Sequence, residues 1–249
     1  MIDVFPVLII LMTGIFSGMF GTLAGGSGLI GIPVLIILGF SPQTAIGTFF
    51  FGVTGMNLAG WYGFHRKQFI DYRIGLLVAI PTFAGAILGA TIVLQINEGV
   101  LKKVIAILTL LTLAFMLVKP NIGLENKKRI IRRREYLMAG ALSLLLGVYL
   151  GFYGAVAGTF LSYILIFLFG QTFLESAATR KIALTFSSVI ATIIFALGGT
   201  VIYQVGIQLL LSTAIGAYIA VYYSDRIGNV WIKRLFLLTA FIMAIKLVL

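Results

Sequence analysis

The chain has 249 residues, of which 61% are hydrophobic and 10% are charged, and its mean hydropathy is +1.14. A soluble globular domain carries about 25% charged residues, so most of this chain's outside must face lipid. A net charge of +11 would suggest nucleic-acid binding in a soluble protein. Here the basic residues lie in loops between apolar runs, which indicates contact with anionic lipid headgroups and no nucleic-acid partner. The absence of cysteine excludes disulfides, thiol catalysis and cysteine metal sites.

Ten apolar runs follow one another along the chain, at about 4–24, 28–40, 43–64, 73–95, 100–118, 136–156, 159–170, 174–198, 204–223 and 232–249. The first run lacks a basic n-region, so we expect no cleaved signal peptide. Most runs are long enough to cross a hydrocarbon core of about 30 Å as helices. The second run of each half is too short, because a helix of that length reaches only about 20 Å. We therefore expect the turns at Ala24–Gly28 and Ala157–Thr159 inside the membrane, or short helices that end there.

A glycine pattern in the first run recurs in the second half of the chain. Residues 14–25 and 147–158 share four glycines and an alanine in the same places at an offset of 133. From Gly39 onward an offset of 131 holds, and it pairs Gly39 with Gly170. The chain is therefore predicted to be two copies of one apolar unit. Duplicated units with glycine-interrupted segments are typical of transporters whose site lies between the copies.

Lysine and arginine predict how the two copies are oriented. If the loop at 65–73 is cytoplasmic, threading five runs per copy places fifteen of the eighteen Lys and Arg residues on that side. This positive-inside bias and the odd number of runs predict an inverted second copy, with both termini outside. We expect repeats at 1–118 and 136–249, joined by a basic cytoplasmic linker at 119–135. The predicted protein is a multi-pass protein of a prokaryotic cell membrane.

The predicted fold class is therefore an all-α membrane protein. It is an inverted repeat of two five-segment helical bundles, with about ten membrane segments that include one short half-helix in each repeat. The pattern indicates no particular oligomeric state.

Several motifs resemble those of a known family. Gly18–Gly28 is rich in glycine, and Pro33, Gly39-Phe40-Ser41-Pro42 and Ala45-Ile46-Gly47-Thr48 follow it in the order found in the TauE/SafE family of sulfite and organosulfonate exporters. The resemblance spans the whole chain, because the second half repeats the pattern in degraded form. It implies a multi-pass inner-membrane carrier of small sulfur-containing anions. Together with the inverted repeat, it favours a secondary transporter that exports such oxyanions by alternating access.

The glycine run is the first candidate for the substrate site. Its glycines leave backbone N–H groups uncovered just before a short helix, whose N-terminus presents unpaired donors and a partial positive charge. A sulfite, sulfonate or sulfate can accept several of those donors. The mirror position in the second copy offers another such end. Close helix packing is the alternative explanation for these small residues, and we favour the site. The candidates are Gly25, Gly26, Ser27, Gly28, Gly158 and Thr159.

Three further polar residues are candidate ligands within the apolar runs. Thr48 and Thr179 are repeat partners, and each hydroxyl can donate to an anion or bond back to the backbone. Asn57 lies near the middle of the third run, where an amide needs a partner and so either lines the pathway or joins helices.

Arg180 and Lys181 are charges that the duplication does not explain, since their repeat partners are Phe49 and Phe50. A cation partway into the membrane is costly and usually functional. We expect Arg180 to attract an anion at the cytoplasmic mouth, because its planar fork suits oxyanions. Lys181 is expected to extend its ammonium group to the membrane interface. Pairing with Glu175 is the alternative.

The remaining titratable residues favour neither a metal site nor catalysis. His65 is the only histidine and lies in a basic loop, and all seven acidic residues fall in loops or near the ends of the apolar runs. We therefore expect no cofactor, no metal and no enzymatic activity. An anion channel on the same fold, an uptake carrier for a related anion, and a membrane enzyme or accessory subunit remain the alternatives.

Overall fold

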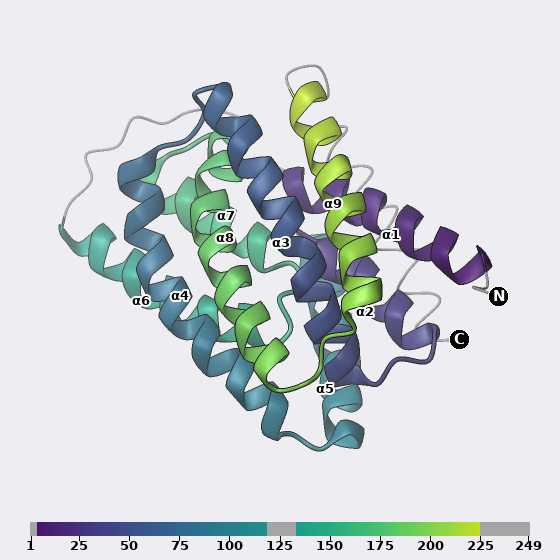
Figure 1. The fold of residues 1–249 in the computed structure, drawn as a ribbon. Helices are drawn as coiled ribbons and strands as arrows, with labels where there is room; N and C mark the ends of the chain where they lie inside the picture. Colours follow the sequence, from purple (N-terminus) through teal and green to yellow (C-terminus); the bar gives the residue numbers. More distant parts are fainter. Residues whose placement is uncertain (1–3, 119–132, 225–249) are drawn as a thin grey trace.

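A computed structural model describes residues 4–118 and 133–224, and within these ranges the chain folds into nine helices and no strands (Figure 1). The linker residues 119–132 and the tenth predicted run at 232–249 lie outside the described residues. The helices are α1 (Val4–Leu23), α2 (Ser27–Ile37), α3 (Pro42–Arg66), α4 (Tyr72–Gln95), α5 (Glu98–Val118), α6 (Arg133–Phe152), α7 (Ala157–Phe169), α8 (Phe173–Leu197) and α9 (Tyr203–Tyr223). Five of them, α1, α4, α6, α8 and α9, are long and apolar enough to cross a membrane.

Side-chain caps set the start of three of the long helices. The Ser41 side chain accepts a hydrogen bond from the Thr44 backbone before α3, and the Asp71 carboxylate accepts one from Ile74 before α4. Thr172 and Glu175 form a reciprocal capping box at the start of α8. In contrast, α2 and α7 have 11 and 13 residues, so they reach only about 16 and 20 Å.

The most extensive contacts between helices join the two halves of the chain. Helix α4 packs along α6, and α1 packs along α9 (Figure 1). A methyl group placed on Gly18 would lie 2.2 Å from the carbonyl oxygen of Thr213, and one on Gly147 would lie 2.3 Å from the carbonyl oxygen of Thr82. Any side chain at these two glycines would collide with backbone, so glycine is what lets each pair of helices approach so closely.

These two interfaces correct the predicted alignment of α1 with α6. Gly85 faces the carbonyl oxygen of Leu144, and its partner at offset 131, Gly216, faces that of Ile15. Leu144 therefore corresponds to Ile15 at an offset of 129, as Gly147 does to Gly18, so the offset of 133 is wrong by one helical turn. The cause is that four glycines coincide at an offset of 133 and only two, Gly18 with Gly147 and Gly25 with Gly154, at an offset of 129, so the glycine pattern alone favours the other alignment.

The same shift moves the second break in the chain. It was expected at Ala157–Thr159, but α6 ends at Phe152 and α7 already begins at Ala157. The break therefore falls at 153–156, and the first break at 24–26 lies within the predicted turn.

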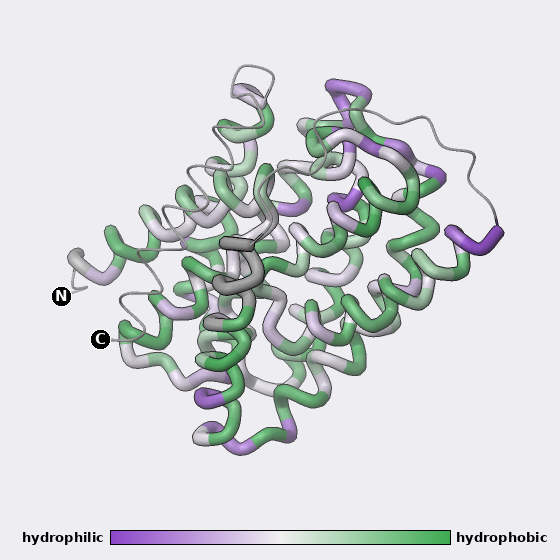
Figure 2. Tube along the Cα trace, turned by 180° about the vertical axis from the view of Figure 1, so that it is seen from behind, coloured by the Kyte–Doolittle hydropathy of each residue, from purple (hydrophilic) through white to green (hydrophobic). Residues whose placement is uncertain are grey.

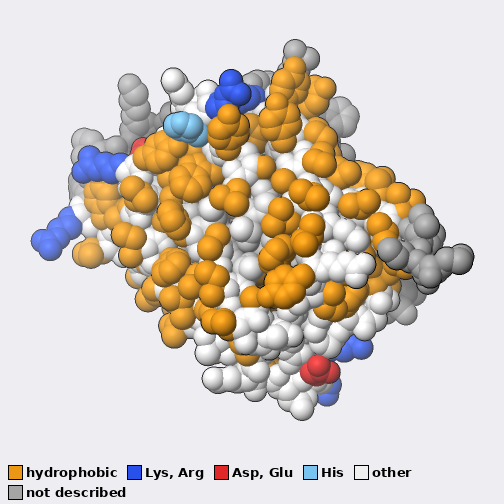
Figure 3. Space-filling view, in the orientation of Figure 1, with side chains coloured by type: hydrophobic (Ala, Val, Ile, Leu, Met, Phe, Trp, Pro, Cys, Tyr) orange, Lys and Arg blue, Asp and Glu red, His pale blue; other side chains and the backbone are white. Residues whose placement is uncertain are grey.

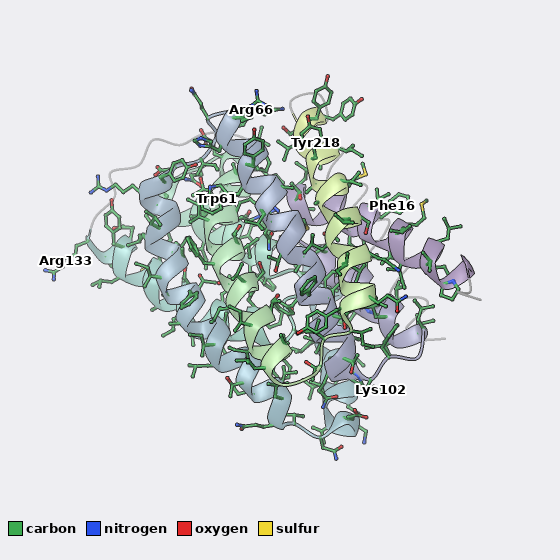
Figure 4. All side chains as sticks on the ribbon, in the orientation of Figure 1. Phe16, Trp61, Arg66, Lys102, Arg133 and Tyr218 are labelled. Atoms are coloured by element: carbon green, nitrogen blue, oxygen red, sulfur yellow. The ribbon has the colours of Figure 1, made fainter. Side chains whose placement is uncertain are left out.

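The outer surface is apolar around the middle of the molecule. Hydrophilic stretches of the tube collect at the loops, while the helices between them are mostly hydrophobic (Figure 2). Apolar side chains cover the face seen in Figure 3, with Lys and Arg at its margins. Figure 4 places Arg66 at the top of the molecule, Arg133 at its left edge and Lys102 near the bottom. Phe16 and Tyr218, on α1 and α9, are 54% and 59% exposed, as expected for side chains in contact with lipid.

Candidate functional site

The two breaks in the chain touch each other. Gly25 has a φ of +92°, Gly154 one of +70° and Val156 one of +62°. A methyl group on Gly25 would lie 2.4 Å from the backbone nitrogen of Thr159, and one on Gly158 would lie 3.0 Å from the Cα of Gly25. The positive φ values let each chain turn sharply, and the missing side chains let the two turns come into direct backbone contact.

A short helix starts from each break without a side-chain cap. Helix α2 follows Gly26 and helix α7 follows Val156, and neither N-cap residue supplies a side-chain hydrogen bond. Val156 is one of two non-glycine residues with positive φ in the described ranges, a conformation that is uncommon for a β-branched residue. The uncapped first turns leave backbone N–H groups that can donate to a ligand.

A small cavity of about 40 Å³ lies beside these helix starts. Its lining comes from both breaks and from α3, α6 and α8, and it is largely apolar. The lining residues are Gly21, Gly25, Ser27, Gly28, Phe49, Phe50, Val53, Met56, Asn57, Leu150, Tyr153, Gly154, Gly158, Leu184 and Ser188.

Arg180 is fully buried and joins the last turn of α1 to the first two turns of α7. Its Nη1 donates to the carbonyl of Gly158 at 3.0 Å and to the hydroxyl of Ser162 in the second turn of α7. Its Nη2 donates to the carbonyls of Leu23 and Thr22, at 2.9 and 3.1 Å, in the last turn of α1. The guanidinium thus covers carbonyls at a helix C-terminus, where a positive charge is favourable. Its Nε has no partner and is buried.

Lys181 is also fully buried, which corrects the expectation that it reaches the membrane interface. Its Nζ donates to the hydroxyl of Thr22 and to the side-chain oxygen of Asn57, both at 3.3 Å. The Asn57 amide in turn donates to the Ser188 hydroxyl at 3.2 Å. Helix α8 is buried on every side over Ser176–Thr185, so no short path to the interface exists for this lysine.

Neither cation has an acidic partner in the ranges that the structure describes. All the oxygens that accept from Arg180 and Lys181 belong to carbonyl, hydroxyl or amide groups. The predicted alternative, pairing with Glu175, does not occur, and that carboxylate accepts from the Thr172 backbone instead. Two adjacent buried positive charges without a carboxylate are unfavourable, and a negative ligand beside them would offset part of that cost.

The structure brings most of the predicted site residues together. Gly25, Ser27, Gly28, Asn57 and Gly158 line the cavity. Gly26 is the N-cap of α2, the Thr159 hydroxyl donates to the Ala24 carbonyl in the first break, and Arg180 bonds to the helix ends beside both breaks. Arg180 was expected at the cytoplasmic mouth, and it lies instead in the interior with none of its surface exposed.

Thr48 and Thr179 lie away from the cavity, where their hydroxyls bind backbone. The Thr48 hydroxyl accepts from the N–H of Ile202, at 3.0 Å, just before α9. The Thr179 hydroxyl accepts from the N–H of Asp71, at 3.1 Å, just before α4. Both threonines are fully buried, so each one satisfies a backbone donor of the other half of the chain.

Several residues at the site were not predicted from the sequence. They are the cavity residues Phe49, Phe50 and Tyr153 and the buried Lys181. The pairing of Ser188 with Asn57 had a signal, because they are repeat partners at offset 131. Nothing in the local sequence separates a buried lysine from one that reaches the interface, since that depends on which helices surround α8.

The chain matches the family model described as "Sulfite exporter TauE/SafE" over residues 10–247. The chain belongs to the TauE/SafE family. The resemblance noted from the glycine run and the motifs that follow it is thereby confirmed.

Curated relatives of this TauE/SafE chain are named as membrane transporters. A "Probable membrane transporter protein" of Haemophilus influenzae is 30% identical over 241 residues, which cover 96% of this chain and 93% of the relative. YfcA of Escherichia coli K12 is 27% identical over 96% of this chain and 88% of its own length, and YdhB of Bacillus subtilis is 27% identical over 94% and 95%. No solved structure matches the chain. The TauE/SafE chain is thus a membrane protein of a transporter family.

Proposed function

We propose that this chain is a secondary transporter of a small sulfur-containing oxyanion, such as sulfite or an organosulfonate, that exports it across the cytoplasmic membrane. The sulfur chemistry is proposed from the name of the family, which is that of a sulfite exporter. The anionic charge is supported by the site itself. The single observation that carries the proposal is the pair of buried cations, Arg180 and Lys181, beside a cavity and without a carboxylate in the described residues.

The anion would be held by groups around the two breaks. The first-turn N–H groups of α2, from Ser27 and Gly28, and the N–H of Gly158 in α7 would donate to its oxygens. Asn57 and Lys181 would meet it at one side of the cavity, since Asn57 lines the cavity and accepts from the Lys181 ammonium. Arg180 would contribute positive potential from behind the breaks, because most of its N–H groups already donate to protein oxygens.

We propose alternating access between two inverted repeats as the mechanism. Equivalent contacts across the two halves support it. Gly18 packs against the Thr213 carbonyl as Gly147 packs against that of Thr82. The Thr48 hydroxyl bonds to the start of α9 as the Thr179 hydroxyl bonds to the start of α4. A site at the junction of two such halves becomes accessible from either side when one half rocks against the other.

Counterflow in proteoliposomes tests the carrier. Vesicles loaded with unlabelled sulfite should take up labelled sulfite faster than empty vesicles, because a carrier exchanges substrate across a site that opens to one side at a time. The same vesicles should take up labelled phosphate no faster than protein-free vesicles. Equal uptake by sulfite-loaded and empty vesicles would contradict the carrier.

The favoured alternative is an anion channel on the same fold, which would give sulfite currents with no stimulation by exchange. An uptake carrier for a related anion would show the same counterflow as an exporter. The direction of transport in cells separates an exporter from an uptake carrier. Cells that overproduce an exporter should lose preloaded anion faster than cells with an empty vector.

A further inference from the structure

A separate hollow lies at the loop between α3 and α4. It measures about 350 Å³ and is lined by His65, Arg66, Gln68, Ile70 and Tyr72. None of these residues lines the cavity at the breaks. Arg66 marks this loop at the top of the molecule in Figure 4, and the positive-inside bias predicts that the loop faces the cytoplasm. The hollow is therefore a feature of the membrane surface and not of the transport site.

The side chains of the hollow offer two donor groups to an anion. The Tyr72 hydroxyl lies 2.7 Å from the Nδ1 of His65, and the two rings meet edge to face. In the tautomer that accepts from this phenol, the imidazole carries its proton on Nε2, which has no partner among the described residues. The exposed guanidinium of Arg66 also has no partner within the described ranges. Guanidinium and imidazole N–H groups both suit phosphate oxygens.

The turn that shapes the hollow has an unusual backbone conformation. Gln68 has a φ of +57°, in a region that glycine usually occupies at the end of a helix. Its N–H donates to the His65 carbonyl at 3.0 Å. The neighbouring Lys67 donates to the hydroxyl of Ser224 at 3.1 Å, which holds the turn against the end of α9. Glutamine at this position gives the hollow a polar side chain that glycine would not supply.

An apolar surface continues from the hollow towards the middle of the molecule. Leu76 and Ile80 follow Tyr72 by one and two turns on the same face of α4, and they are 49% and 72% exposed. Helix α8 packs against both α3 and α4 and lies between them (Figure 1). Its exposed Phe186 has a ring centroid 5.9 Å from that of Trp61 on α3. Polar donors at the end of an apolar surface match a ligand with a charged head and hydrocarbon chains.

We propose that this hollow binds an anionic phospholipid such as phosphatidylglycerol. The phosphodiester accepts from the Arg66 guanidinium and the His65 imidazole, and an acyl chain lies along the exposed side chains of α4 and α8. Asp71 is the only acidic residue of the loop. It does not line the hollow, and its carboxylate accepts from the Ile74 N–H at the start of α4. The charge of the hollow is therefore opposite to that of the headgroup.

A defined lipid site differs from a general attraction of basic loops to anionic lipid. General attraction depends on the number of charges near the membrane, at about fivefold in affinity for each Lys or Arg. Arg66 and Arg73 would then contribute equally. Arg73 belongs to the same loop and is exposed, but it does not line the hollow. A lipid bound in the hollow depends on Arg66 and not on Arg73.

Quenching of tryptophan fluorescence by brominated lipid tests the proposal, because Trp61 lies beside the proposed path of the acyl chain. The chain has two tryptophans, Trp61 and Trp231, so Trp231→Phe in the full-length protein leaves one reporter. This variant is reconstituted in phosphatidylcholine vesicles with a rising fraction of brominated phosphatidylglycerol or brominated phosphatidylcholine. We expect half-maximal quenching at an about fivefold lower fraction of the anionic lipid. Equal quenching by the two lipids overturns the proposal.

Two matched variants in the Trp231→Phe protein locate the site. Arg66→Gln and Arg73→Gln each remove one positive charge from the same loop. We expect Arg66→Gln to lose most of the preference for phosphatidylglycerol and Arg73→Gln to keep it. An equal loss in both variants would indicate general attraction and overturn the defined site.

Inorganic phosphate separates a lipid headgroup from a free anion in the same assay. Sodium phosphate at about 10 mM replaces chloride at constant ionic strength. We expect the preference for phosphatidylglycerol to remain, because a bound lipid is also held by its acyl chain. Loss of the preference would assign the hollow to free phosphate and overturn the lipid site. Neither result depends on sulfite transport, so the proposed function is tested separately.

Discussion

The ammonium nitrogen of Lys181 lies 3.3 Å from the side-chain oxygen of Asn57, and Asn57 faces the cavity between the two breaks. Asn57 also donates to the Ser188 hydroxyl and to the Leu184 carbonyl. The amide thus links a buried cation to the cavity, and all of its hydrogen-bonding partners come from α8. A ligand that displaces the Asn57 oxygen would meet the lysine directly.

Lys181→Met is expected to separate anion binding from stability. Methionine fills a similar volume without charge, so the variant removes a buried cation that lacks a carboxylate partner, a change that is often neutral or stabilising. We expect sulfite affinity, measured by calorimetry on purified protein, to fall by about tenfold or more while the apparent Tm stays level or rises. Lys102→Met, at an exposed lysine of α5, is the control and should change neither quantity. Unchanged affinity in Lys181→Met would remove this lysine from the site.

Arg180→Gln is expected to destabilise the fold. The substitution leaves carbonyls of Thr22, Leu23 and Gly158 without their donor in the interior, and losing one member of a buried charged network costs about 3 kcal/mol or more. We expect an apparent Tm about 6–12 °C lower in detergent. Arg66→Gln, at an exposed arginine, should leave the Tm within about 2 °C of the parent. A Tm for Arg180→Gln as high as that of Arg66→Gln would show that the hydrogen bonds from Arg180 to α1 and α7 contribute nothing to stability.

Gly25→Ala is expected to block the contact between the breaks. The new methyl group would lie 2.4 Å from the Thr159 nitrogen, at a φ of +92° that alanine rarely adopts. We expect a loss of about 2 kcal/mol or more of stability and little remaining sulfite exchange. Gly140→Ala, with nothing within 4 Å of its new methyl group, should stabilise its helix slightly. If the two alanine variants behave alike in thermal unfolding and exchange, the close approach of the breaks is not required.

Thr48→Val is expected to affect stability and leave affinity unchanged. The variant keeps the shape of the side chain but removes the acceptor for the Ile202 N–H, which costs about 1–3 kcal/mol when the donor is buried. Thr179→Val should behave the same way at the start of α4, through Asp71. Thermal unfolding and sulfite calorimetry on each variant check this. A tenfold loss of affinity with an unchanged Tm would instead return these threonines to the substrate site.

Cysteine labelling tests whether the repeats are inverted, and the chain offers a clean background because it contains no cysteine. Arg73 and Gln204 are exposed partners at offset 131, near the starts of α4 and α9. We expect a membrane-impermeant thiol reagent added to intact cells to label Gln204→Cys and to leave Arg73→Cys unlabelled until the membrane is opened. Labelling of both variants from the outside would mean that the copies run in the same direction.

Most of the helical architecture could be predicted from sequence. Apolar runs longer than a bilayer core, separated by loops with basic and capping residues, predict helices to within a few residues, because hydrophobic length and capping act locally. The nine runs within the described ranges all correspond to helices, and the two short ones are α2 and α7. The exception is the register of α1 against α6, since more glycines coincide at an offset of 133 than at 129, and only the contacts with α9 and α4 reveal the second alignment.

Part of the candidate site could also be predicted from the sequence, and part of it could not. A glycine run before a short helix is a local signal, and Gly25, Ser27, Gly28, Asn57 and Gly158 were identified from it and from polarity within apolar runs. The burial of Lys181 and the use of Thr48 and Thr179 as backbone acceptors were decided by the tertiary structure alone. The physical reason is that a side chain's partner in each case comes from a helix more than a hundred residues away. Composition determined that this chain lies in a membrane, and the packing of its halves decided where two buried positive charges and a cavity meet.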